Sequence, residues 1–113
     1  MSFMESYKRL DNLCKDLFAG NIGVTEYINS MEKCTLQNGV ENFQQDYIKL
    51  KHYRHMRNKI AHENDVTEDE LCTNDDIEWI ENFYRRILSQ TDPLALYRKN
   101  ELNLCYKYNR TVE

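Results

Sequence analysis

The residues best suited to chemistry lie together in the run KHYRHMRNKIAH, residues 51–62. Arg57 is followed directly by Asn58, and His62 comes five residues after Arg57. A guanidinium binds phosphate oxygens through its planar fork of donors. An imidazole transfers protons near neutral pH. This pair of residue types therefore indicates chemistry at a phosphodiester.

The run ends a long helix, which we expect over about residues 41–62 because the segment contains neither Gly nor Pro. At about 100° per residue, one broad arc of this helix is apolar: Phe43, Tyr47, Leu50, Tyr53, Met56, Ile60 and Ala61. Arg57 lies close to the centre of this arc, and Asp46 also falls inside it. A buried charge is costly unless it is paired or faces water. Two interpretations of Arg57 therefore stand: it snorkels or bridges to a carboxylate within the bundle, or it faces a cleft that binds phosphate.

His62 is displaced from Arg57 by about 7.5 Å along the helix axis and about 140° around it. It belongs to a polar stripe with Lys51, His55 and Asn58 at the edge of the apolar arc. The helix C-terminus and the following carboxylates favour the imidazolium, which would poise His62 for proton transfer near neutral pH. The alternative is a helix-capping or surface role.

The elements that position these residues are expected to be helices, since the chain has only 3 Gly and 1 Pro. We predict an all-α, small up-and-down bundle of four to five helices, forming one domain over residues 1–113. The first expected helix runs over about 2–18, the second from a Thr25 N-cap to about Asn38-Gly39, and the third over about 41–62. The fourth begins at an N-cap, either Thr73 or Asn74, and one of its faces is apolar: Ile77, Ile80, Phe83, Tyr84, Ile87 and Leu88. A short fifth helix begins at Asp92-Pro93.

Two smaller segments complete this prediction. Thr67 to Glu70 has the pattern of a capping box that opens a short acidic turn. Residues 105–113 alternate weakly in polarity and are expected to be extended or frayed.

Charge is distributed unevenly along the chain, although the net charge is only −4. Residues 41–62 carry five Lys or Arg against two carboxylates, a balance of +3, whereas residues 63–83 carry nine carboxylates and no Lys or Arg. One interpretation is that the two segments neutralise each other as the chain turns back. The other is that the acidic segment shields or shapes a phosphate-binding groove.

The run that contains Arg57, Asn58 and His62 resembles the signature of HEPN domains, in which an Arg, a polar residue, three further residues and a His end a long helix of a small bundle. The resemblance covers about Glu41–Glu63. It implies a metal-independent endoribonuclease that acts as a homodimer, with Arg57, Asn58 and His62 as catalytic residues and 2′,3′-cyclic phosphate ends as products.

The same resemblance implies a possible toxin or defence role with a neutralising antitoxin partner, and no cofactor or metal. One departure concerns Asn64, because many HEPN toxins carry a Tyr two residues after the His. Many family members are non-catalytic interaction modules, and this alternative stays open. Four further residues are expected to bind RNA phosphates: Lys51, Arg54, His55 and Lys59.

Other sequence features favour simple structural roles. Four scattered cysteines without a C-x-x-C pair indicate reduced, packed thiols rather than a zinc site. His52 and His55 lie one turn apart, but His62 is too distant to share a metal with them. Aromatic and basic residues between Tyr97 and Arg110 suit either single-strand binding or packing on the bundle or on a dimer partner. Without an apolar run of membrane-spanning length or a signal peptide, we expect a cytoplasmic protein that is not embedded in a membrane.

Overall fold

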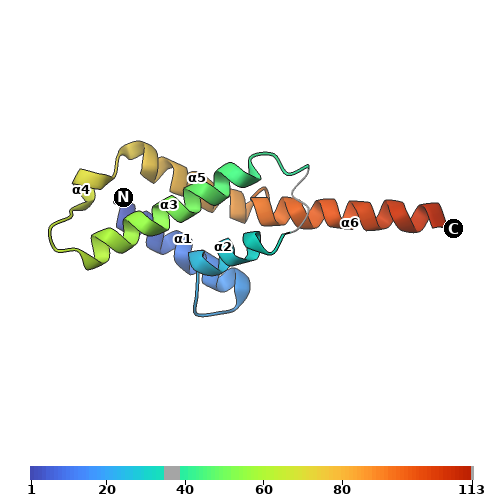
Figure 1. The fold of residues 1–113 in the computed structure, drawn as a ribbon, viewed down its shortest axis with the longest axis horizontal. Helices are drawn as coiled ribbons and strands as arrows, with labels where there is room; N and C mark the ends of the chain where they lie inside the picture. The colour runs from blue at the N-terminus through green and yellow to red at the C-terminus, as the bar shows by residue number, and fades with distance from the viewer. Residues whose placement is uncertain (35–38, 113) are drawn as a thin grey trace.

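The computed structural model describes the backbone of residues 1–34 and 39–112, and side chains as far as residue 102. All regular structure in this part of the chain is helical, which confirms the predicted all-α bundle (Figure 1). The helices are α1 (Phe3–Phe18), α2 (Val24–Glu32), α3 (Phe43–His62), α4 (Glu68–Leu71), α5 (Asn74–Leu88) and α6 (Pro93–Val112). The described chain has one helix more than expected because the acidic turn forms the four-residue α4. None of these helices is long and apolar enough to cross a membrane.

The first two helices meet through a capping interaction that spans the turn between them. Ser2 caps α1, since its hydroxyl accepts a hydrogen bond from the Glu5 N–H at 3.1 Å. The prediction that Thr25 caps α2 was wrong, because Gly23 is the N-cap. An Asp11 carboxylate oxygen from α1 accepts from the Val24 N–H at 2.8 Å instead. A carboxylate distant in sequence thus replaces the local cap.

Helix α2 ends at Glu32, earlier than the predicted Asn38-Gly39, and residues 35–38 lie outside the described part of the chain. Helix α3 begins at Phe43 rather than Glu41 because Asn42 has a left-handed backbone, with φ of 62°. Its buried face follows the predicted apolar arc at Phe43, Leu50, Tyr53 and Met56. Tyr47 and Ile60 are partly buried, whereas Ala61, also assigned to the arc, is exposed.

The predicted capping box at α4 does not form. Thr67 is the N-cap residue but makes no side-chain cap hydrogen bond, and a Glu68 carboxylate oxygen accepts from the Met4 N–H of α1 at 2.8 Å. Thr73 is the N-cap of α5, one of the two residues predicted. Leu88 was predicted to lie on the apolar face of α5, and this prediction was wrong, because Leu88 is 60 % exposed. The neighbouring Ile87 is buried in the core instead.

Aromatic side chains join the helices at the centre of the bundle. The Phe3 ring of α1 lies 6.0 Å from the Tyr53 ring of α3, which lies 5.3 Å from the Trp79 indole of α5. Trp79 stacks on Phe83 at 5.1 Å, and Phe83 meets the edge of Tyr27 from α2 at 5.3 Å. These contacts fix α3, which carries the motif, against α1 and α5.

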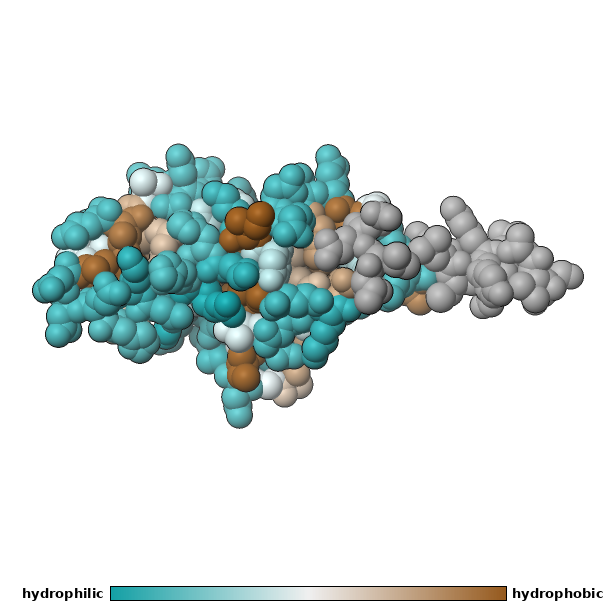
Figure 2. Space-filling model, viewed as in Figure 1, coloured by the Kyte–Doolittle hydropathy of each residue, from teal (hydrophilic) through white to brown (hydrophobic). Residues whose placement is uncertain are grey.

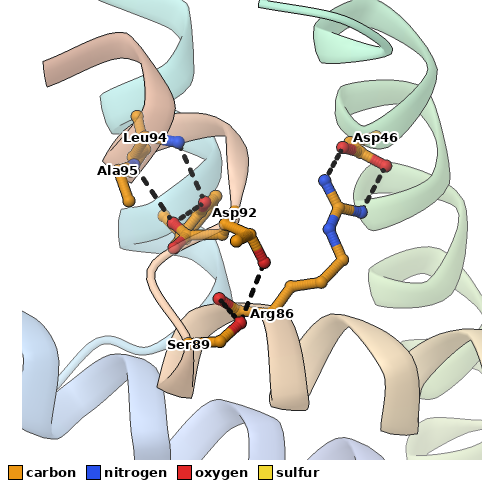
Figure 3. Close-up of polar contacts among 8 residues, drawn as sticks. Asp46, Arg86, Ser89, Asp92, Leu94 and Ala95 are labelled. Atoms are coloured by element: carbon orange, nitrogen blue, oxygen red, sulfur yellow. Dashed lines mark hydrogen bonds and ion pairs between the residues drawn. The ribbon is translucent and has the colours of Figure 1, made fainter. Parts of the chain in front are cut away.

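Two polar interactions, one at Asp46 and one at Asp92, lie near these apolar contacts (Figure 3). Asp46 of α3 is only 5 % exposed, and its carboxylate receives both ends of the Arg86 guanidinium of α5, at 3.1 and 2.7 Å. The Tyr27 hydroxyl donates to the Asp92 carboxylate at 2.5 Å and accepts from the Leu94 N–H at 3.2 Å. Asp92 therefore joins the start of α6 to the middle of α2.

Helix α6 is much longer than predicted. It begins at Pro93, as expected, but its backbone stays helical to Val112, so the prediction of an extended or frayed segment from residue 105 was wrong. The helix extends away from the bundle (Figure 1), and the molecule measures 64 × 26 × 22 Å. Its radius of gyration is 16.4 Å, against about 13 Å for a compact domain of this size.

Candidate functional site

Arg57 lies on α3 without an acidic partner. Its side chain is partly buried, and one guanidinium nitrogen donates to the Asn58 side-chain oxygen at 3.1 Å. Among the residues whose side chains are described, no carboxylate lies within ion-pair distance of Arg57. Within the described side chains, the interpretation as a carboxylate bridge is therefore wrong, whereas the interpretation that Arg57 snorkels stays a prediction. The other charge in the apolar arc, Asp46, is the one that is paired.

Arg57 and Asn58 line an open pocket of about 230 Å³, here called the α1–α3 pocket. Three elements other than α3 contribute to it: α1, the turn after α1, and the first turn of α2. Its lining residues are Tyr7, Asp11, Lys15, Asn21, Ile22, Gly23, Thr25, Arg54, Arg57 and Asn58. Three cations and one carboxylate thus line one concave surface, a charge balance that suits an anion.

Hydrogen bonds and burial fix the shape of this pocket. Asp11 binds the Val24 N–H and lies 3.4 Å from the Lys15 ammonium. A Cβ atom on Gly23 would clash with the backbone oxygen and carboxylate of Asp11, so this position requires glycine. Arg54 donates to the Thr25 hydroxyl at 3.5 Å. The pocket is therefore held by contacts between α1, α2 and α3.

Tyr7 closes the inner side of the pocket and is only 6 % exposed. Burial, assisted by the nearby Asp11 charge, raises the pKa of the Tyr7 phenol well above its usual value, against the opposing effect of Arg57 and Arg54. The phenol therefore keeps its proton at neutral pH and is a potential hydrogen-bond donor.

His62 is the last residue of α3 and is exposed. It does not line the α1–α3 pocket. The helix geometry places its Cα about 7.5 Å along the axis from that of Arg57 and about 140° around the axis. Within one chain, the structure brings Arg57 and Asn58 together and leaves His62 on a different side of the helix.

The four predicted phosphate-binding residues also divide into two groups. Arg54 lines the α1–α3 pocket beside Arg57. Lys51 and His55 are exposed and Lys59 is partly exposed, outside this pocket. The Lys51 ammonium lies 5.0 Å from the centre of the Tyr47 ring. The face of the molecule shown in Figure 2 is largely hydrophilic over α3, in agreement with these exposed polar residues.

The acidic segment, residues 63–83, makes more of its polar contacts with α1 than with the basic helix α3. Glu81 forms an ion pair with Arg9 of α1 at 3.1 Å, and Glu68 binds the Met4 N–H. Asp76 accepts hydrogen bonds from the Thr73 N–H at 2.8 Å and from the Tyr53 hydroxyl of α3 at 2.9 Å. In the described side chains, the cations of α3 form no ion pair with this segment. The expected direct neutralisation of α3 is therefore not seen at contact distance.

The pKa of Asp76 reflects these contacts. Burial raises this pKa, but hydrogen bonds from the Thr73 backbone and the Tyr53 hydroxyl outweigh burial, and the net effect is a lowered pKa.

The cysteines whose side chains are described are free thiols: Cys14, Cys34 and Cys72. Burial raises the pKa of Cys14 to about 12 and that of Cys72 to about 11. Because only the thiolate is a strong nucleophile, neither is activated for catalysis at neutral pH. No group of three or more His, Cys, Asp or Glu side chains is arranged to hold a metal in the described residues, while Cys105 lies outside the described side chains.

Sequence reasoning missed the parts of the pocket that lie outside α3. Tyr7 and Lys15 lie within the first expected helix, over about residues 2–18, and residues 21–23 lie between the first two expected helices; none of them was predicted to belong to a site. The one signal in the sequence was the position of Arg57 within an apolar arc, which required a wet or charged neighbour that the linear sequence does not identify.

Comparison with known protein families gives one match. The chain belongs to a family of unknown function, DUF6548, whose model matches residues 1–113. No curated protein and no solved structure matches the chain.

Proposed function

We propose that this DUF6548 chain is a metal-independent endoribonuclease of the HEPN type that acts as a homodimer. The observation that supports the proposal most is the position of Arg57: partly buried, without a carboxylate partner, and open to a pocket rich in cations. A structural arginine in a bundle is normally paired, as Arg86 is with Asp46. An unpaired arginine at a pocket is available to bind a phosphate.

A homodimer would supply the imidazole that Arg57 lacks within its own chain. The exposed side of α3 carries Ile48, which is 57 % exposed, together with exposed Lys51, His55 and His62. Arg57 lies about 140° around the helix from His62, on the side of the α1–α3 pocket. A two-fold axis near the C-terminal end of α3 would therefore have to bring the partner subunit's His62 to the pocket side of the helix, around one RNA strand. Each copy would contribute one guanidinium and one imidazole to the site.

The chemistry then needs no metal. One His62 accepts the proton of the ribose 2′-hydroxyl, whose oxygen attacks the phosphorus. The partner subunit's His62 donates a proton to the 5′-oxygen as its bond to phosphorus breaks. Arg57 stabilises the negative charge on the pentacovalent phosphate, and Asn58 holds the guanidinium through its hydrogen bond. The products are a 2′,3′-cyclic phosphate and a 5′-hydroxyl.

The test is RNA cleavage in the presence of EDTA by the purified chain and its Arg57→Ala, Asn58→Ala and His62→Ala variants. His52→Ala is the matched control, because His52 is an exposed histidine of the same helix outside the motif. We expect cleavage to survive chelation, to persist in the control, and to fall by at least about a hundredfold when His62 or Arg57 is removed. A 2′-deoxy substitution at the cleaved position should block the reaction. Cleavage that persists in His62→Ala would refute the mechanism.

A biological test follows from the same site. Expression of an active nuclease should arrest growth, and His62→Ala should relieve the arrest, as expected for a toxin. Asn64 in place of the Tyr of many HEPN toxins argues against control by modification at that position, so a neutralising partner would act by binding.

The second candidate function is a non-catalytic HEPN-like interaction module. It is favoured by one observation: the Asn58 oxygen is engaged by Arg57 and is therefore not oriented toward His62. An imidazole without an orienting partner is a poor general base. If neither the chain nor its dimer cleaves any RNA, while the wild type and His62→Ala bind RNA equally, this second function is supported.

A further inference from the structure

The α1–α3 pocket contains more cationic groups than the reaction at a single phosphate requires. Arg57 and Asn58 serve the scissile phosphate in the proposed mechanism, but Arg54 and Lys15 also line the pocket. Lys15 comes from the last turn of α1, and Arg54 lies one helical turn before Arg57 on α3. Two helices therefore direct cations to the same concave surface.

The negative charge already in the pocket is neutralised. The Asp11 carboxylate binds the Val24 N–H at 2.8 Å and lies 3.4 Å from the Lys15 ammonium. Because this carboxylate is the only acidic side chain among the described lining residues, the two guanidiniums have no acidic partner there. A mobile anion is the natural partner for them.

Two kinds of hydrogen-bond donor add to these charges. Thr25 lines the pocket from the first turn of α2, where backbone N–H groups have no acceptor within the helix. Tyr7 is 6 % exposed, keeps its proton, and makes no hydrogen bond to another described side chain through its hydroxyl. This phenol lines the wall of a cationic pocket, where its O–H can donate to an acceptor from outside the chain.

The volume of the pocket limits what it holds. About 230 Å³ corresponds to roughly seven or eight water molecules at about 30 Å³ each. The pocket is open to solvent, so a bound phosphate group would fill its concave part while the attached riboses and bases extend outside it.

We propose that the α1–α3 pocket binds a phosphate of the RNA strand that flanks the phosphate to be cut, through Arg54, Lys15 and the Tyr7 hydroxyl. This inference rests on the proposed nuclease function. It assigns to the turn between α1 and α2 a role in substrate binding, and it predicts that the enzyme requires at least one further nucleotide beside the cleaved bond. The contacts are to the backbone, so they carry no sequence preference.

The test uses binding rather than cleavage, so its failure is distinguishable from failure of the nuclease proposal. A labelled single-stranded RNA with 2′-O-methyl riboses is titrated into the full chain at several salt concentrations. We expect Arg54→Gln and Lys15→Gln each to weaken binding by about tenfold. Each should also reduce the slope of log affinity against log salt by about 0.7, the value for one phosphate contact of a single strand.

The matched controls are Arg85→Gln and Lys8→Gln, which remove exposed cations of the same types outside the pocket. Both should keep the affinity and the salt slope within about twofold of the wild type. Tyr7→Phe should weaken binding while circular dichroism stays unchanged. If the Arg54 and Lys15 variants bind RNA as tightly as the controls, the proposal is overturned.

A second arm separates RNA from free phosphate as the ligand. Inorganic phosphate is titrated while the backbone amide signals of Thr25 and Glu26 are followed by NMR. Shifts in the wild type that vanish in Arg54→Gln, together with competition against the RNA, support one phosphate site used by the strand. Shifts without any loss of RNA affinity in Arg54→Gln identify a site for free phosphate and overturn the assignment to RNA.

Discussion

The pair formed by Asp46 and Arg86 ties α3 to α5, and its removal should lower the stability of the bundle by an amount that the structure sets. Both guanidinium ends are bound, at 3.1 and 2.7 Å, and the interaction raises the pKa of Arg86 further above its usual value, despite burial. Asp46→Asn keeps the shape of the side chain but removes its charge and turns an amide N–H₂ toward the guanidinium.

The expected loss follows from burial. Breaking a fully buried pair costs roughly 3–5 kcal/mol, because the remaining charge is left unpaired. The Asp46 side chain is 7 % exposed, but that of Arg86 is 32 % exposed, so water recovers part of the loss. We expect Asp46→Asn to lower the free energy of unfolding by about 2–3 kcal/mol. With a urea m-value of about 1.5 kcal/mol/M, the midpoint should fall by about 1.3–2 M.

Urea denaturation followed by circular dichroism measures this change. A double-mutant cycle with Arg86→Gln isolates the pair, because the loss of the Arg86 contact with the Phe83 ring, at 5.3 Å, cancels in the cycle. Glu81→Gln is the comparison, since its pair with Arg9 is more exposed, at 21 % and 44 %, and should contribute less than about 1 kcal/mol. A coupling energy for Asp46 and Arg86 below about 0.5 kcal/mol would show the reasoning to be wrong.

Three further predictions concern single residues. The pKa of Asp76 is lowered in the folded state, so its carboxylate stabilises the fold at pH values above its unfolded pKa of about 4. This stabilisation is lost as the pH falls through the folded pKa, and Asp76→Asn should therefore weaken the decrease of the free energy of unfolding at acidic pH. Gly23→Ala should cost about 1–3 kcal/mol through its clash with Asp11, whereas Gly20→Ala, whose Cβ meets only an ordinary contact at 3.8 Å, should stay within about 0.5 kcal/mol in the same urea assay. The Ser6 hydroxyl is buried and has no hydrogen-bond partner among the described residues, so Ser6→Ala should raise the melting temperature by about 4 °C; a fall would mean that this hydroxyl has a partner in solution.

The elements that depend on local pattern were predictable from the sequence. The apolar arc of α3 and the Ser2, Thr73 and Asp92-Pro93 positions at helix starts follow from residue spacing and side-chain chemistry, and the helices begin there or within two residues. Tertiary contacts decided the departures. Thr25 does not cap α2, because the Asp11 carboxylate of α1 accepts a hydrogen bond from the Val24 N–H instead. The capping box at α4 is absent, and the Glu68 carboxylate accepts from the Met4 N–H of α1.

The candidate site was predictable only in its α3 part. An arginine in an apolar arc signals that something unusual faces it, but the sequence alone does not distinguish a carboxylate from a pocket. Asp46 and Arg57 are both charged residues within the apolar arc, but their surroundings differ. Asp46 is paired with Arg86, whereas Arg57 lines the α1–α3 pocket. The contribution of Lys15 and Tyr7 depends on the packing of α1 on α2, which no local pattern encodes.

The junction at Asp92 gives α6 the mechanics of a lever. The helix is about 30 Å long, from twenty residues at about 1.5 Å each, and its base is fastened to Tyr27 in the core. A tilt of about 10° at that base would sweep the far tip through roughly 5 Å. A molecule that binds the far end of α6 and tilts the helix would therefore strain the hydrogen bond between Tyr27 and Asp92. Conversely, a substitution at Tyr27 would change the orientation of the far end of α6.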